Sequence, residues 1–167
     1  ALTADIKIRL ITELSHASGT YGMVGGQMLD MKGEERKLNL SELQLIHANK
    51  TGKLLTFPVV AAGIVAGVAA EELEELRKAG SLIGLAFQVR DDILDVTASF
   101  EEIGKTPKKD LLADKATYPS LLGLDKSYEI LNQSLDQALA IFKNLSATHD
   151  LHAEKITEMI ERLRLNA

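Results

Sequence analysis

Apolar residues recur three or four positions apart along most of the chain. Between residues 4 and 31 they fall at Leu10, Leu14, Ala17, Tyr21, Val24, Met28 and Met31. This spacing is typical of a helix with one face toward a core, and no segment shows the strict alternation of a strand. The sequence therefore predicts an all-α fold, a helical bundle, and its 167 residues are enough to bury a sizeable core.

The expected helices follow one another along the chain. Ser41 and Gln44 form a capping-box pattern, and the helix that they open is expected to kink or break at Pro58. A third helix is expected from Ala70, where acidic residues suit the helix dipole, and it becomes apolar nearly all round after Leu82, which predicts burial. Two amphipathic helices close the chain, with apolar stripes at Leu131, Leu135, Ala138, Phe142 and Leu145, and at Leu151, Ile156, Ile160 and Leu163.

Four glycines interrupt the first of these helices: Gly19, Gly22, Gly25 and Gly26. Each glycine costs a helix about 1 kcal/mol relative to alanine. So many in one stretch predict that the backbone there approaches another helix or a ligand closely.

Composition narrows the classes of function. The chain has no cysteine, which excludes a thiol nucleophile and a thiolate zinc site. A net charge of -5 and an aromatic content of 4% argue against nucleic-acid binding. The longest apolar run, residues 57–70, is shorter than the roughly 20 residues of a membrane span and predicts a buried helix. Since no signal-peptide pattern follows Ala1, we expect a cytoplasmic protein.

Three carboxylates stand close together near the end of the third expected helix. Asp91 and Asp95 are four positions apart and share a face, and Asp92 is adjacent. Like charges at this spacing repel, a helix end favours cations, and unpaired buried charge is costly. A bound divalent cation would relieve this repulsion, and carboxylate oxygens suit Mg²⁺ held together with a substrate phosphate. Alternatively, the acids point to solvent and pair with Arg90 or nearby lysines.

Basic residues lie on both sides of this acidic motif. Lys50 and Thr51 precede Pro58, and the stretch after the acids carries Lys105, Lys108, Lys109 and Lys115. Lysine binds phosphate groups as a point charge, so lysines and Mg²⁺ together suit a diphosphate. An ordinary solvated loop would also account for the lysine-rich stretch taken alone.

The acidic motif and the Lys50–Thr51 pair belong to a series of five sequence blocks along the chain. They are GMVGGQMLD (Gly22–Asp30), KTGKLL (Lys50–Leu55), GLAFQVRDDILD (Gly84–Asp95), GK (Gly104–Lys105) and DKATYPSLLG (Asp114–Gly123). In this order and spacing they resemble the trans-isoprenyl diphosphate synthases, closest to the bacterial farnesyl and geranylgeranyl (short-chain) type. The resemblance covers essentially the whole chain and implies the helical bundle of the isoprenoid synthase type.

The resemblance also implies roles for single residues. The acids match the family's second aspartate-rich motif, which holds Mg²⁺ bridging to the allylic diphosphate: Asp91, Asp92 and Asp95. Residues implied to bind the diphosphate are Lys50, Thr51, Gln88, Lys105 and Lys115. The first three of these are also the implied catalytic residues. Side chains implied to line the same cavity are Gln27, Asp30 and Phe87.

The activity implied by the resemblance is that of a prenyltransferase in isoprenoid biosynthesis. It would condense an allylic diphosphate with isopentenyl diphosphate, with farnesyl diphosphate as the expected product. Mg²⁺ and lysines would neutralise the diphosphate leaving group as its C–O bond breaks. The double bond of isopentenyl diphosphate would then attack the allylic cation. A homodimer is implied as well, and neither a nucleic acid nor a membrane span is expected.

Two motifs of the family are absent from the sequence. These are the first aspartate-rich motif and the basic GGKR-type segment that helps to bind isopentenyl diphosphate. Family members have several more helices before the position of Ala1. We therefore expect residues 1–167 to form the C-terminal part of a single all-α isoprenoid synthase domain, and to be inactive or nearly so in isolation.

Two other functions are compatible with an all-α chain of this kind. The first is a non-catalytic regulatory or scaffold subunit that pairs with a complete prenyl diphosphate synthase. The retained acidic and lysine residues weigh against it, because a scaffold has no need of them. The second is a terpene cyclase, whose second metal motif usually mixes Asn or Asp, Ser or Thr, and Glu, unlike the DDILD of this chain.

Overall fold

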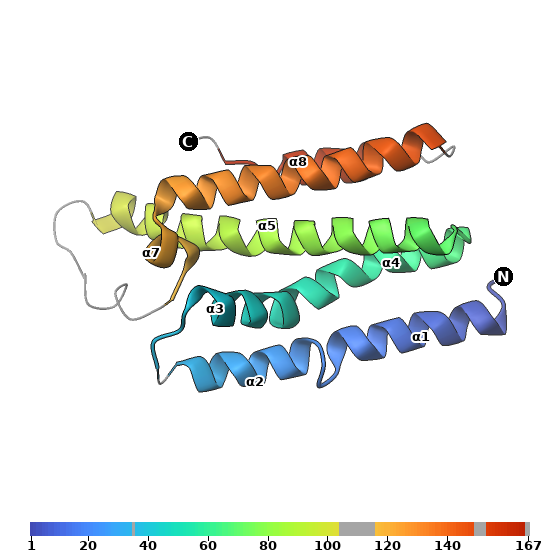
Figure 1. Cartoon of the computed structure of the whole chain (residues 1–167), viewed down its shortest axis with the longest axis horizontal. Helices are drawn as coiled ribbons and strands as arrows, with labels where there is room; N and C mark the ends of the chain where they lie inside the picture. Colours follow the sequence, from blue (N-terminus) through green and yellow to red (C-terminus); the bar gives the residue numbers. More distant parts are fainter. Residues whose placement is uncertain (35, 104–115, 149–152, 166–167) are drawn as a thin grey trace.

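The computed structural model describes residues 1–34, 36–103, 116–148 and 153–165, and within these ranges the fold is all-α without a strand, as predicted. Four rods lie side by side in Figure 1: α1 with α2, then α3 with α4, then α5, then α8. The elements are α1 (Ala4–Ser18), α2 (Met23–Gly33), α3 (Leu40–His47), η1 (Ala48–Gly52), α4 (Lys53–Ala66), α5 (Ala70–Ile103), α7 (Tyr118–Leu122), α8 (Leu124–Thr148) and α9 (Glu154–Glu161).

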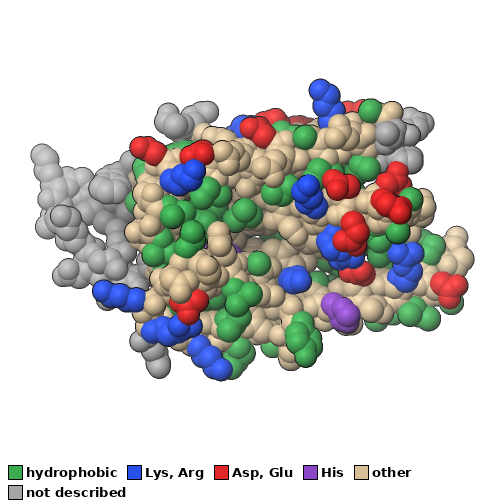
Figure 2. Space-filling model, viewed as in Figure 1, with side chains coloured by type: hydrophobic (Ala, Val, Ile, Leu, Met, Phe, Trp, Pro, Cys, Tyr) green, Lys and Arg blue, Asp and Glu red, His purple; other side chains and the backbone are tan. Residues whose placement is uncertain are grey.

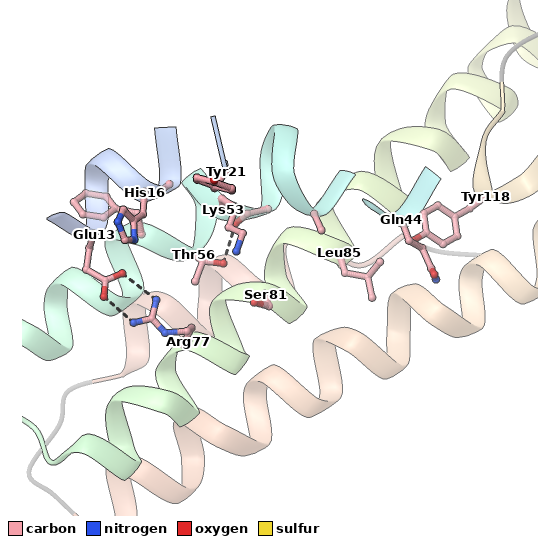
Figure 3. A pocket seen from close by; sticks show the side chains of 14 residues that line it. Glu13, His16, Tyr21, Gln44, Lys53, Thr56, Arg77, Ser81, Leu85 and Tyr118 are labelled. Carbon is pink, nitrogen blue, oxygen red and sulfur yellow. Dashed lines mark hydrogen bonds and ion pairs between the residues drawn. The ribbon is translucent and has the colours of Figure 1, made fainter. Parts of the chain in front are cut away.

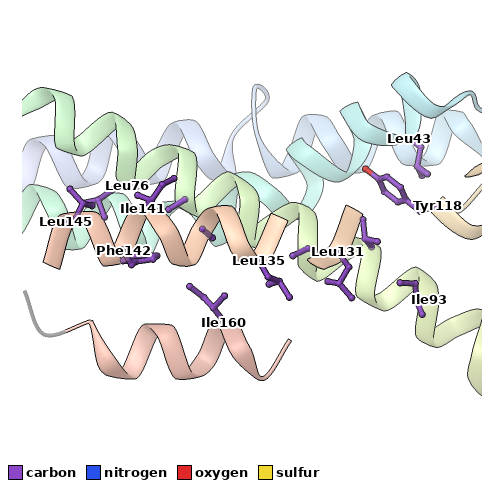
Figure 4. Packing of buried hydrophobic residues seen from close by; sticks show 14 residues of the cluster. Leu43, Leu76, Ile93, Tyr118, Leu131, Leu135, Ile141, Phe142, Leu145 and Ile160 are labelled. Atoms are coloured by element: carbon purple, nitrogen blue, oxygen red, sulfur yellow. The ribbon is translucent and has the colours of Figure 1, made fainter. Parts of the chain in front are cut away.

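The main core lies between α5 and α8, with contributions from α3, α7 and α9 (Figure 4). Its buried residues are Leu43, Leu76, Ala79, Ala86, Val89, Ile93, Tyr118, Leu131, Leu135, Ala138, Ile141, Phe142, Leu145 and Ile160. Every member of the apolar stripe predicted for α8 is therefore buried, which confirms that prediction. Burying one large apolar side chain contributes roughly 1.5–3 kcal/mol, so this interface is the main source of stability. Leu151, expected on the last stripe, lies outside the described residues.

A smaller core joins α4 to α5 and α1. Val60 and Ile64 of α4 pack with Leu73 of α5, and Ile6 and Leu10 of α1 cover them. α4 is followed by its C-cap residue, Gly67, which takes the left-handed conformation (φ 70°) that glycine adopts without steric cost. This turn reverses the chain, so that α5 can return alongside α4.

The first expected helix is in fact two helices. α1 ends at Ser18 and α2 begins at Met23, and Gly19 and Gly22 lie in the break between them. The predicted core stripe is wrong for most of its members, because no described helix covers that face. Ala17 is buried, but the exposed members are Leu14, Tyr21, Val24, Met28 and Met31. Figure 2 shows hydrophobic side chains along this edge of the molecule.

Helix starts were predicted with mixed success. Thr3 is the N-cap of α1, and its Oγ1 accepts the N–H of Ile6 at 3.4 Å. The capping box before α3 is formed by Asn39 and Glu42, two residues earlier than predicted. The Glu42 N–H donates to Asn39 Oδ1 at 3.0 Å, and the Asn39 N–H donates to Glu42 Oε2 at 3.0 Å.

Two helices run further than the sequence indicates. α4 continues through Pro58 to Ala66, so of the expected kink or break at the proline, the break does not occur. α5 begins at Ala70 as predicted and continues to Ile103, beyond the acidic motif that was expected near its end. Of its described apolar residues after Leu82, three are buried, Ala86, Val89 and Ile93, whereas Leu82 itself is only half-buried. Over the ranges given above, the helices are too short or too polar to span a membrane.

Candidate functional site

The segment that carries Lys50 and Thr51 is a π turn, η1, between α3 and α4. The N–H of Lys53 donates to the carbonyl of Ala48, five residues back, where an α-helix would join residues four apart. Turns of this type occur frequently at functional sites. Here the turn displaces the two predicted diphosphate-binding residues from regular helical positions.

Neighbouring helices approach η1 at the level of the backbone. A Cβ atom added at Gly26 of α2 would lie 2.2 Å from the backbone nitrogen of Lys50. One added at Gly84 of α5 would lie 2.9 Å from the Cα of Gly52. Real Cβ atoms do not come so close, so both positions require glycine. The predicted close approach of the glycine-rich segment is therefore confirmed at Gly26, and α2 and α5 together fix the place of η1.

The Lys50 side chain lies against α2. Its Nζ is 2.5 Å from Oδ2 of Asp30, and both side chains are about one-third exposed. An ammonium group carries three donors, so that Asp30 can hold Lys50 while the same lysine also binds an anion. Gln27 lies one turn earlier on α2 and is exposed. α2 thus supplies the carboxylate that orients the predicted diphosphate-binding lysine.

The next group of site residues lies on one side of α5. Gln88 and Asp91 are half-buried and Asp95 is exposed, with the three-and-four spacing of a single helix face. Arg90 Nη1 lies 3.8 Å from Asp91 Oδ1. Burial raises the pKa of Asp91, the Arg90 charge opposes this, and the Asp95 charge raises it further. The mutual repulsion of two carboxylates favours a cation beside them.

Asp92 takes a different direction from its two neighbours. It is only 7% exposed, and its Oδ2 accepts the backbone N–H of Tyr118 at 2.9 Å. In the part of the chain that the structure describes, no three acidic or histidine side chains converge on one metal position. The structure therefore brings Asp91 and Asp95 together but does not bring Asp92 to them.

The remaining predicted site residues are only partly described. Thr51 on η1 and Phe87 on α5 are half-buried. Lys105 and Lys115, predicted to bind the diphosphate, lie outside the described residues. The described part of the predicted site thus comes from three elements, α2, η1 and α5.

A cavity of about 750 Å³ lies between α1, the α3–α4 rod and α5 (Figure 3). It runs from Gln44 and Tyr118 at one end to Glu13, His16 and Arg77 at the other. Three predicted cavity residues do not line it: Gln27, Asp30 and Phe87. Instead it is lined by sequence neighbours of the predicted catalytic residues: Gly52, Lys53 and Leu85.

An ion pair that the sequence analysis missed closes one end of this cavity. Arg77 of α5 donates to both carboxylate oxygens of Glu13 of α1, at 2.8 and 3.0 Å. The hydrogen bond from Arg77 holds the pKa of Glu13 below its ordinary value, against the opposing effect of burial. Its partners are 64 positions apart, so no helical spacing rule connects them, and only the packing of α1 near α5 reveals the pair.

Replacing Glu13 with glutamine is expected to lower the free energy of unfolding by up to about 1 kcal/mol at neutral pH, the upper range for partly exposed ion pairs. Because the folded-state pKa of Glu13 lies below its ordinary 4.5, this stabilisation is present above that pH and is lost as the pH falls through the folded-state pKa. Urea titrations at several pH values would measure it, with exposed Glu75→Gln as the control. A difference from wild type that persists unchanged at low pH would contradict the assignment.

Comparison with known proteins covers nearly the whole chain. Residues 3–160 match the family model for polyprenyl synthetase. Farnesyl diphosphate synthase of Micrococcus luteus is 48% identical over 161 residues, which is 96% of this chain and 55% of the relative. Farnesyl diphosphate synthase of Bacillus subtilis is 46% identical over 150 residues, 90% of this chain and 51% of the relative. The chain spans about half the length of the curated relatives it matches.

Solved structures give the same result for the fold. Geranyltransferase from Helicobacter pylori, complexed with magnesium and isoprenyl diphosphate, matches with a TM-score of 0.79 and 34% identity, over 97% of this chain and 53% of that one. An FPP/GFPP synthase from Zymomonas mobilis matches with a TM-score of 0.79 and 29% identity, over 96% of this chain and 52% of that one. The resemblance seen in the five sequence blocks is confirmed: this chain belongs to the polyprenyl synthetase family.

Proposed function

We propose that this chain carries the allylic-diphosphate half of a prenyltransferase site. The whole protein would condense an allylic diphosphate with isopentenyl diphosphate, with farnesyl diphosphate as the product. The observation that carries the proposal is the backbone contact between Gly52 and Gly84. It sets Lys50 and Thr51 on η1 beside the start of the segment that leads to Asp91.

The described residues fit a magnesium ion. Mg²⁺ is usually held by one or two carboxylates, with water and a substrate phosphate completing the coordination. Asp91 and Asp95 supply two carboxylates on one face of α5. Burial raises the pKa of Asp91, and the neighbouring charge of Asp95 raises it further. Bound there, Mg²⁺ would withdraw charge from the diphosphate as it leaves. In the family, the H. pylori geranyltransferase is a magnesium and isoprenyl diphosphate complex.

Side chains of this chain would bind the diphosphate and line the cavity beside it. Lys50, oriented by Asp30 at 2.5 Å, would bind the diphosphate and neutralise the charge that develops on it. Thr51 and Gln88 would line the place where the allylic cation forms. Predicted contacts from Lys105 and Lys115 would complete the phosphate site. The aspartate-rich motif that is absent from this chain would come from the other half of the domain, of which residues 1–167 would be the C-terminal part.

Thermal unfolding with ligand tests this proposal. We expect Mg²⁺ with an allylic diphosphate or a bisphosphonate to raise the Tm of the chain, because a ligand at 100 times its Kd stabilises a protein by about 2.7 kcal/mol. Asp91→Ala should abolish the shift, whereas Glu75→Ala, an exposed acid on the same helix, should keep it. An unchanged Tm at saturating ligand would contradict the proposal and favour a scaffold subunit.

Product formation tests a second part of the proposal. We expect the chain alone to form little or no prenyl product from an allylic diphosphate and isopentenyl diphosphate, because the first aspartate-rich motif is absent from it. Radiolabelled isopentenyl diphosphate would measure the yield. Efficient turnover by the purified chain would show that the second half of the site is dispensable, and would contradict this division of the site.

A homodimer is the proposed assembly. The α1–α2 edge exposes apolar side chains that a second copy would cover, among them Ile8, Ile11, Val24, Met28 and Met31 (Figure 2). Sedimentation velocity should give the mass of a dimer, and Met28→Glu should shift the chain toward monomer. A wild-type monomer at high concentration would contradict this assembly. The cytoplasmic location stays a prediction.

A further inference from the structure

Asp92 differs from the other two acids of its motif in its burial and in its hydrogen bond to a distant backbone group. Asp91 is half-buried and Asp95 exposed, whereas Asp92 is 7% exposed. Its Oδ2 lies 2.9 Å from the backbone nitrogen of Tyr118, a residue 26 positions later in the chain. An ion held by Asp91 and Asp95 would lie at a more exposed side of α5 than the one Asp92 faces.

The hydrogen bond of Asp92 satisfies a donor that α7 leaves open. Thr117 caps this short helix: its Oγ1 accepts the N–H of Ser120 at 3.2 Å, and the Ser120 Oγ accepts the N–H of Thr117 at 2.9 Å. The N–H of Tyr118, in the first turn, has no partner within the helix. The Asp92 carboxylate accepts it, and a hydrogen bond to an ionised acceptor is among the stronger ones in proteins.

Tyr118 in turn connects this contact to the rest of the fold. Its side chain is fully buried, and its ring lies 5.8 Å from the ring of His47, at the end of α3. The ring also lines the end of the cavity, facing Gln44 (Figure 3). Burial raises the pKa of Tyr118 to about 12, and the nearby Asp92 charge adds to this. The contact therefore joins α5 to both α7 and α3.

We propose that Asp92 is a positioning residue that anchors α7 to α5, and that it is not a ligand of the metal. The anchor holds Tyr118 at the end of the cavity and leaves cation binding to Asp91 and Asp95. The claim that Asp92 is not a metal ligand rests on the proposed function. The claim that Asp92 anchors α7 to α5 rests only on the contacts of Asp92 and Tyr118.

An asparagine can distinguish the two roles. The amide oxygen of asparagine accepts a backbone N–H much as a carboxylate does, so an anchor survives Asp92→Asn in large part. A metal ligand does not, because the amide lacks the charge that a hard cation prefers. Alanine removes both functions and leaves the buried N–H of Tyr118 without its acceptor.

The experiment compares Asp92→Asn, Asp92→Ala and Asp91→Asn by thermal unfolding, without ligand and with Mg²⁺ plus inorganic pyrophosphate. Without ligand, Asp92→Ala should lower the Tm by roughly 3–10 °C, and Asp92→Asn should recover most of that loss. With Mg²⁺ and pyrophosphate, Asp92→Asn should keep the wild-type shift, while Asp91→Asn should bind roughly tenfold more weakly.

Two results would overturn the proposal. The first is an Asp92→Asn variant that melts like wild type but loses the Mg²⁺–pyrophosphate shift, as a ligand would. The second is an Asp92→Ala variant with an unchanged Tm, which would show that α7 needs no anchor. Failure of wild type to respond to Mg²⁺ and pyrophosphate would count against the proposed function only, because the comparison of Ala with Asn at Asp92 needs no ligand.

Discussion

Gly26→Ala is expected to lower the Tm of the chain by several degrees, although alanine ordinarily stabilises a helix by about 1 kcal/mol relative to glycine. The new Cβ would lie 2.2 Å from the backbone nitrogen of Lys50 and 2.6 Å from its Cα. A backbone cannot yield as a flexible side chain does, so α2 must separate from η1. Overpacking of this kind costs about 1–3 kcal/mol and at times more. Differential scanning calorimetry or urea titration would measure the loss.

Gly52→Ala is the matched control for this variant. Gly52 lies on η1 itself, two positions after Lys50, but a Cβ there would meet only the His47 carbonyl oxygen, at an ordinary 3.5 Å. We expect this variant to melt within a few degrees of wild type. A Gly26→Ala variant as stable as Gly52→Ala would show that α2 and η1 are not in backbone contact. Because Lys50 moves with η1, Gly26→Ala should also reduce the rise in Tm that Mg²⁺ with inorganic pyrophosphate produces.

Leu135→Ala is expected to have the largest effect of any substitution considered, a loss of about 2–5 kcal/mol in the free energy of unfolding. Leu135 is fully buried between α8 and α5 (Figure 4). Truncation there removes apolar burial and leaves a cavity that the rigid helix pair closes only in part. For a chain of this size the loss corresponds to a fall in Tm of roughly 5–20 °C.

Leu45→Ala makes the same chemical change at an exposed position. Leu45 on α3 is 52% exposed, and surface substitutions usually change stability by less than about 0.5 kcal/mol. Equal losses at Leu135 and Leu45 would contradict the placement of the main core between α5 and α8. Equilibrium urea titrations of both variants, fitted with a common slope, would measure the difference.

Periodicity predicted the buried face of α8 in full, because that face is set by the sequence of one helix. Leu131, Leu135 and Phe142 are all buried as expected. The same reasoning failed for α1 and α2, where Met28 and Met31 are exposed. An apolar stripe indicates that a helix has something to cover, but it does not indicate which partner covers it. In this chain no described element lies on that side.

Local patterns were ambiguous, silent or only partly right at three features of the α3–α4 rod. The segment NLSELQ contains two capping-box patterns, Asn39 with Glu42 and Ser41 with Gln44, and nothing local decides between them. The earlier one forms. The π turn gave no signal either, because the residues on both sides of it are helical. Pro58 was expected to kink or break the helix, and α4 continues through it without a break.

The candidate site was predictable where its residues belong to one helix. The spacing of Gln88, Asp91 and Asp95 placed them on one face of α5, and the structure has them there. The partner of Asp92 was not predictable, because Tyr118 comes from a distant segment. The same holds for the contact of Lys50 with Asp30, which depends on two helices crossing at a glycine. Spacing rules describe a single helix and do not extend across such crossings.

The π turn has a consequence for insertions and deletions in this chain. Such a turn holds one residue more than an α-helical turn, so losing one residue between 48 and 52 would restore a regular helix and leave α3 and α4 in phase. A one-residue deletion in the middle of α5 would instead rotate everything beyond it by about 100°, and would swing Asp91 and Asp95 off their face. The α3–α4 rod can therefore shorten by one residue and still fold, but the residue it loses is the one that displaces Lys50 and Thr51 from helical register.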